Sequence, residues 1–223
     1  MTERGMIFNG EMVRALLDGR KTQTRRIMNV QPESNQFGLL HITSSTKRSD
    51  IGKYHWAESN ATGNHVRSKL FSCPFGAVGD RIWVRETFQG PLFDYDLMDS
   101  YCKDPTPFEK PEFCVYKADG VPAPEFYDAD DELHCCWRPS IHMPRWASRI
   151  LLEITDVRVE RLQSITLGDI CKEVGCGLYD FRPATYGFQV WEELWKSIYG
   201  AESWNTNPWV WVIEFKRVEG GAA

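Results

Sequence analysis

The stretch CCWRPSIHMPRWASRILLEITDVRVERL, residues 135–162, carries the strongest strand signal in the chain. Its second half alternates apolar and polar side chains on either side of a break near Thr155-Asp156, and the apolar positions are Ile150, Leu152, Ile154, Val157 and Val159. Such alternation is typical of a strand with one buried face. We therefore expect a strand that is broken near Thr155-Asp156.

Two other stretches predict strands that can pair with this one. GAVGDRIWVRETF (76–88) begins with a turn and continues as an alternating strand, and NPWVWVIEFKRV (207–218) predicts a final strand. One face of the first of these strands carries Ile82, Val84, Glu86 and Phe88. Because the strands need one another across the whole length, we expect a single domain, 1–223.

Three stretches predict helices. NGEMVRALLD (9–18) starts with an N-capping asparagine and is followed by Gly19 as a left-handed stop. SITLGDICKEVG (164–175) is capped by Thr166 and ends at a glycine. FQVWEELWKSIYG (188–200) also ends at a glycine, and its predicted buried face comprises Phe188, Trp191, Leu194, Trp195 and Ile198.

Strands and helices in this order predict an α+β fold with two long polar insertions, at about 29–75 and 89–132, the second with a strand at 113–117. Charge is unevenly distributed along the chain. Residues 91–135 carry twelve acids and three lysines, whereas residues 1–30 carry six cations and three acids. A basic patch on an acidic body suits a small anionic ligand or a short nucleic-acid segment better than bulk duplex.

The composition excludes several classes of protein. The 223 residues are 42% hydrophobic and have a net charge of −5, and no run approaches the roughly 20 apolar residues of a membrane span. The first five residues lack the basic and apolar regions of a signal peptide, so we expect a soluble, cytoplasmic protein. Its seven cysteines form no CxxC pair, and we expect reduced thiols, no metal and no cofactor.

Positive charge gathers in GRKTQTRR, residues 19–26, where four cations are interleaved with two threonines. Basic strands are usually solvated and pair with acids, and the 31 acidic residues of this chain offer many partners. Cations interleaved with hydroxyls also suit an anionic ligand. The residues alone leave both interpretations open.

With these motifs the chain resembles the ASCH family, in particular its longer bacterial and prophage members. Gly19, Lys21 and Arg26 fit the family pattern G-x-K-x-x-x-x-R, and GDRIWVRETF, SIHMPRWASRI, KEVG and NPWVWVIEFKRV follow in matching order. The resemblance covers most of the chain outside 30–70 and 92–130. It implies a PUA-like fold, a small mixed β-barrel flanked by helices, whose cleft binds RNA or nucleotide ligands.

One branch of the family resembled here hydrolyses the acetyl amide of N4-acetylcytidine. By position, its catalytic residues correspond to Lys21, Thr24 and Glu173. Thr24 would supply the nucleophilic hydroxyl, and Lys21 would accept its proton once burial or nearby cations had lowered its pKa. Glu173 would orient Lys21 or shuttle the proton, and Arg26 would bind a phosphate or the developing oxyanion.

The spacing within this set limits the hypothesis. In a regular strand, residues 21 and 24 point to opposite faces of the sheet. Lys21 and Thr24 can meet only if Lys21 lies in the turn after Gly19 or if a bulge intervenes. We expect the turn, and one unbroken strand over 20–26 would exclude the triad.

Four more residues are candidates for the ligand cleft: Arg85, Glu86, His142 and Arg145. The glutamate shares the buried face of its strand, where an ion pair with an arginine such as Arg85 or Arg26 is the simpler interpretation. The histidine and second arginine lie in a proline-bounded loop, a common location for functional residues. Base stacking would use Trp83, Trp137 and Trp146, whereas core positions are expected for Trp191, Trp195 and Trp211.

Three functions remain open at this point. The first is a cleft that binds a nucleoside or single-stranded RNA and hydrolyses an N4-acylated cytidine. The second is a module that binds RNA or a modified base without catalysis. The third is a ribonuclease in which Lys21 and His142 transfer protons.

Overall fold

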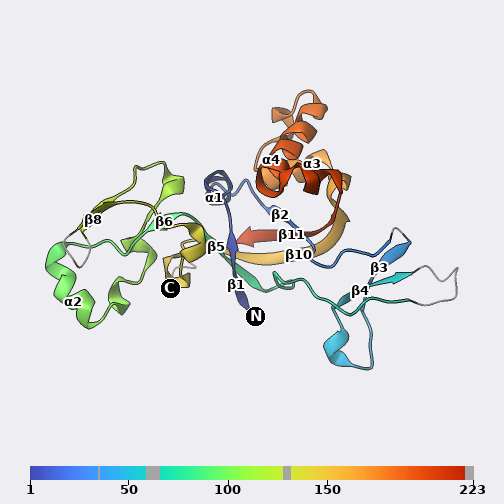
Figure 1. Ribbon diagram of the computed structural model, residues 1–223, viewed down its shortest axis with the longest axis horizontal. Coiled ribbons are helices and arrows are strands. Elements are labelled where there is room, and N and C mark those ends of the chain that lie inside the picture. Colours follow the sequence, from blue (N-terminus) through green and yellow to red (C-terminus); the bar gives the residue numbers. More distant parts are fainter. Residues whose placement is uncertain (35, 59–65, 128–131, 219–223) are drawn as a thin grey trace.

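The computed structural model describes residues 1–34, 36–58, 66–127 and 132–218 (Figure 1). The helices are α1 (Gly10–Leu17), α2 (Met98–Lys103), α3 (Leu167–Val174) and α4 (Ala184–Asn205). The central sheet has the strand order β1 (Glu3–Ile7), β5 (Arg81–Arg85), β10 (Leu151–Arg161), β11 (Trp209–Arg217) and β2 (Gln23–Ile27). Three small antiparallel pairs join β3 (Phe37–His41) to β4 (Tyr54–Glu58), β6 (Phe88–Gln89) to β7 (Val115–Tyr116), and β8 (Glu125–Tyr127) to β9 (Leu133–Cys135).

The central sheet confirms the α+β class and the three main predicted strands. β1 runs parallel to β5, and the remaining neighbours are antiparallel. β10 continues through the predicted break, and at that point its register against β11 shifts between Ile154 and Asp156. One buried face of the β5 region carries Ile82, Val84, Glu86 and Phe88, as the alternation predicts.

The sheet is open in the part of the chain that the structure describes. Its edge strands, β1 and β2, are not paired with each other, so no closed barrel is present there. Arg26 crosses between these edges: its Nη2 on β2 donates a hydrogen bond of 2.7 Å to the carbonyl oxygen of Ile7 on β1. The two edges therefore lie within one arginine's reach.

Local signals place the basic segment as expected. Asn9 caps α1 by accepting a hydrogen bond of 2.8 Å from the backbone N–H of Met12, and Gly19 adopts a φ of 71° after the helix. β2 begins only at Gln23. Lys21 thus lies in the turn, where its N–H bonds the carbonyl of Ala15, and the segment is not one unbroken strand.

α3 and α4 lie together beside β2 and β11 (Figure 1). Thr166 caps α3 through the backbone N–H of Asp169, and Gly175 ends it with a φ of 81°. Trp191 and Trp195 of α4 are buried against this side of the sheet, and Trp211 lies in the main core, as predicted.

The prediction for α4 is wrong in part. The helix starts at Ala184 rather than at Phe188. Gly200 (φ 83°, ψ 161°) is non-helical, so the first helical segment ends there as predicted, and a second short segment continues to Asn205. Phe188 and Ile198 are 42% and 45% exposed, although both were expected to be buried. The buried stripe runs instead through Gly187, Trp191 and Trp195, which share a face at i, i+4 spacing.

The two predicted insertions differ in how they pack against the central sheet and its core. The β3–β4 hairpin brings Trp56, only 1% exposed, into the main core. The later segment, with α2, β6 and β8, forms a lobe on the opposite side of the sheet (Figure 1). The strand predicted at 113–117 is too long: 3₁₀ turns at Pro111–Phe113 and Lys117–Asp119 leave only Val115–Tyr116 paired.

None of the described helices has the length and apolar character needed to cross a membrane. All seven cysteines are free thiols. The described residues contain no cluster of three His, Cys, Asp or Glu side chains suited to holding a metal ion.

Candidate functional site

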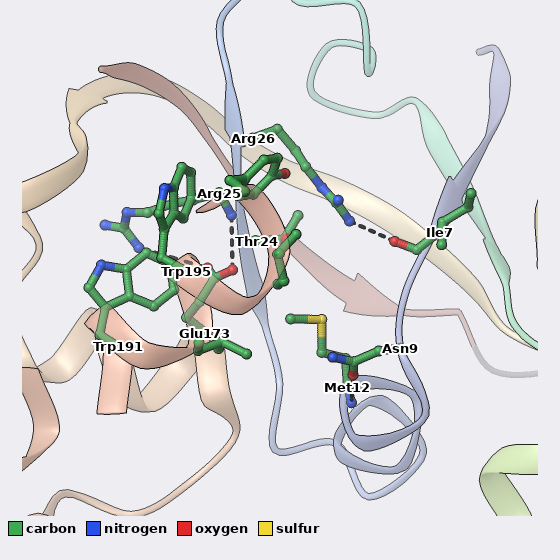
Figure 2. Close-up of a pocket in the computed structure, with 12 residues that line it drawn as sticks. Ile7, Asn9, Met12, Thr24, Arg25, Arg26, Glu173, Trp191 and Trp195 are labelled. Atoms are coloured by element: carbon green, nitrogen blue, oxygen red, sulfur yellow. Dashed lines mark hydrogen bonds and ion pairs between the residues drawn. The ribbon is translucent and has the colours of Figure 1, made fainter. Parts of the chain in front are cut away.

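A cavity of about 170 Å³ lies where β2 meets the α3–α4 layer. One side of its wall is built by Thr24, Arg25, Arg26, Glu173, Trp191 and Trp195. The end of β1 and the start of α1 form the other side, and Figure 2 shows Thr24 pointing into the space between Glu173 and the Asn9–Met12 turn. We call this cavity the aromatic pocket.

Glu173 is a buried carboxylate on the wall of the aromatic pocket, with a side chain only 3% exposed. Its Oε1 accepts the backbone N–H of Arg25 at 3.0 Å, shown dashed in Figure 2. Its Oε2 lies 3.8 Å from Arg25 Nη1 and accepts no hydrogen bond within the described residues. A buried acceptor without a hydrogen bond costs free energy, so this oxygen is suited to a ligand donor.

Lys21 lies directly behind this carboxylate. Its fully buried Nζ is 3.4 Å from Glu173 Oε1, 2.8 Å from the carbonyl oxygen of Gln23, and also donates to the carbonyl of Glu173. Burial lowers the pKa of Lys21, and Arg26 and Arg25 lower it further, while Glu173 opposes them. The carboxylate that faces Lys21 is therefore Glu173 and not Glu86.

Thr24 and Lys21 are close in sequence, but their side chains lie in different surroundings. Thr24 lines the aromatic pocket, whereas Lys21 is absent from its wall. Across the described ranges no hydrogen bond joins the two side chains. The three N–H groups of the Lys21 ammonium each meet an oxygen, so in this arrangement Lys21 is a donor and not yet a base.

Arg25 and Arg26 form the cationic part of the pocket. The Arg25 side chain is fully buried, pairs with Glu160 at 2.9 Å, and stands 6.0 Å from the Trp191 ring. Arg26 reaches Ile7, as described above, and stands over the Phe8 ring at 5.4 Å. The pocket thus presents two guanidinium groups beside one buried carboxylate.

Two of the other predicted ligand residues are held by partners outside the aromatic pocket. Arg85 donates to the carbonyl of Ile141. Glu86 is buried, and both of its oxygens accept hydrogen bonds of 3.0 Å from Arg149. Burial raises the pKa of Glu86 although Arg149 opposes the shift. An arginine ion pair was expected for Glu86, but Arg149 was not the partner named.

His142 and Arg145 belong to two 3₁₀ turns, Ser140–His142 and Arg145–Ala147. Arg145 Nε donates to Glu3 at 3.0 Å. Neither residue lines the aromatic pocket, and neither does Arg85. The structure therefore brings together Lys21, Thr24, Arg26 and Glu173. It leaves the four other predicted residues outside the pocket wall: Arg85, Glu86, His142 and Arg145.

The pocket wall includes three residues that were not predicted as site residues: Arg25, Trp191 and Trp195. The tryptophans were expected in the core, and they are buried there while one side of them forms the pocket wall. Arg25 follows Thr24 on β2, yet both line the cavity, so strand alternation gave no signal for it. Its proximity to two predicted site residues was the available clue.

Comparisons with protein-family models, with curated proteins and with solved structures found no match for this chain.

Proposed function

We propose that this chain belongs to the ASCH family, that its open sheet is a PUA-like barrel with a seam between β1 and β2, and that it binds the base of a nucleoside in the aromatic pocket. The observation that carries the proposal is Glu173 Oε2, a buried oxygen that accepts no hydrogen bond within the described residues, on a wall with aromatic and guanidinium groups. Such a site offers a planar ring apolar contact and accepts a hydrogen bond from its exocyclic N–H. The resemblance to the family supplies the substrate, N4-acetylcytidine.

The proposed reaction is hydrolysis of the acyl amide. The Thr24 hydroxyl attacks the acyl carbon, and its proton passes to Lys21, whose lowered pKa makes the neutral amine accessible. The proton then goes to the departing N4 nitrogen, and water releases acetate from Thr24. Lys21 must exchange one of its three oxygen contacts for the Thr24 hydroxyl, while Glu173 orients it.

A binding module without catalysis is the second candidate. The favouring observation is that the Lys21 ammonium is already satisfied by three oxygens and is absent from the pocket wall. In this case Lys21 only holds Glu173 in place, and Thr24 contributes shape. The ribonuclease hypothesis has no comparable support, because His142 does not line the pocket that Lys21 adjoins.

Incubation with N4-acetylcytidine tests the proposal. Chromatography should show cytidine with the wild type and none above background with Thr24→Ala or Lys21→Met. Thr22→Ala and Lys172→Met are matched controls outside the pocket wall, and they should retain turnover. Binding without turnover, insensitive to Thr24→Ala, would instead favour the module, and cleavage of a short RNA would favour the ribonuclease.

A further inference from the structure

A second cavity, of about 550 Å³, adjoins the aromatic pocket. Ile7 and Asn9 line both cavities, so the two are neighbours across the end of β1. The rest of the second wall includes Arg14 of α1, Glu86 and Thr87 after β5, Lys117 from the lobe that contains α2, β6 and β8, and Ser140. We call this second cavity the outer cavity.

The sizes of the two cavities suggest different occupants. The aromatic pocket, at about 170 Å³, is smaller than the roughly 300–1,000 Å³ of typical ligand pockets, whereas the outer cavity falls within that range. A planar base can use the smaller space, but its ribose and any attached phosphate must lie outside it. The shared wall at Ile7 and Asn9 offers them a route to the outer cavity.

The charges of the outer cavity favour a phosphate over a neutral guest. Arg14 and Lys117 are exposed, and neither forms an ion pair within the described residues. The negative charge of Glu86 is taken up by Arg149, which binds both of its oxygens. Glu11 is the remaining acid on the wall, and the hydroxyls of Thr87 and Ser140 can bond a ribose.

We propose that the outer cavity seats the nucleotide adjacent to the one whose base occupies the aromatic pocket. The ligand is then an RNA strand of at least two nucleotides, and Arg14 and Lys117 bind the phosphate that joins them. This inference rests on the proposed function of the aromatic pocket. It also gives the predicted insertion at 89–132 a role, since Lys117 belongs to it.

Calorimetry with two ligands tests the inference. The ligands are N4-acetylcytidine and a hexaribonucleotide that contains one N4-acetylcytidine at its centre, and Thr24→Ala is present in every arm to keep the amide intact. We expect the oligonucleotide to bind about tenfold or more tightly than the nucleoside, as one charge-assisted phosphate contact allows. Arg14→Gln with Lys117→Gln should remove that gain and leave nucleoside affinity within about twofold.

Two single variants distinguish the loss of a phosphate contact from a loss of folding in the double variant. Lys117→Gln alone removes a side chain with no hydrogen bond in the described structure, and it should lower the salt slope of oligonucleotide binding by about 1. Lys110→Gln, on the same lobe but outside the outer cavity, should change nothing. Equal affinity for both ligands, or an equal loss of affinity for both in the double variant, would overturn this inference. The proposed role of the aromatic pocket in binding the base would be unaffected. Failure of both ligands to bind would overturn both proposals.

Discussion

Arg26 donates a hydrogen bond of 2.7 Å to the carbonyl oxygen of Ile7 and so joins β2 to β1, the two free edges of the central sheet. Both residues line the aromatic pocket. The arginine that closes this seam therefore also forms part of the candidate binding wall. One residue can thus affect both stability and ligand binding.

Arg26→Ala should show both effects. Loss of the hydrogen bond should lower the free energy of unfolding by about 1 kcal/mol, as measured by urea denaturation. Affinity for N4-acetylcytidine should fall as well, as measured by calorimetry. Arg217→Ala is the matched control. Arg217 Nη1 donates a hydrogen bond of 3.1 Å to the carbonyl oxygen of Leu17, and neither residue lines the aromatic pocket. An equal loss of affinity in the control would contradict a binding role for Arg26.

Glu173→Gln should destabilise the fold strongly. The substitution removes the negative charge that faces buried Lys21 and Arg25, and removal of one partner from such a buried group costs about 3 kcal/mol or more. Urea denaturation should show this cost, whereas Glu193→Gln on the exposed side of α4 should change stability by less than about 0.5 kcal/mol. Similar stability of the two variants would contradict a stabilising role for the contacts of Glu173 with Lys21 and Arg25.

The pH dependence of turnover should report Lys21. Because its folded pKa lies below 10.5, the neutral amine appears at lower pH than for a free lysine, and the rate should rise with pH through that lowered value. Stability has the same sign: between the folded pKa and 10.5 the unfolded chain binds more protons, so the Lys21 contribution to stability rises with pH. A rate that is flat with pH, or the same rise in Lys21→Met, would exclude Lys21 as the base.

The packing of α4 on α3 should depend on Gly187. A Cβ placed there would come 2.5 Å from Leu167 Cδ1 and 2.9 Å from the Phe181 ring, so Gly187→Ala should cost about 1–3 kcal/mol. Gly168→Ala is the control at an exposed position of α3, where the nearest atom would be 3.8 Å from the new Cβ, and it should be neutral or slightly stabilising. Thermal unfolding distinguishes them, and equal melting temperatures would contradict the packing described.

Much of the fold could be predicted because its signals are local. The N-cap at Asn9, the stops at Gly19 and Gly175, and the alternation in β10 depend on neighbouring residues in the chain. The exposure of Phe188 could not be predicted in this way, because the packing of Gly187 on α3 sets the rotation of α4. The same limit applies to Trp56, which enters the core only through tertiary packing.

The candidate site was predictable in part for the same reason. Lys21 lies in the turn after Gly19, before β2 begins, and Glu173 on α3 faces its ammonium group. Both positions follow from local signals in the sequence. Arg25 was missed because its role arises from the long-range approach of α3 to β2, which no local pattern records. His142 and Arg145 fitted a loop pattern, but the fold places them outside the pocket wall.

A crystal structure of the Thr24→Ala variant with N4-acetylcytidine tests the central claim most directly. We predict the base beside Trp195 in the aromatic pocket, with a ligand N–H donated to Glu173 Oε2 within hydrogen-bond distance. A ligand bound elsewhere, or one in the pocket that leaves Glu173 Oε2 without a partner, would contradict the account.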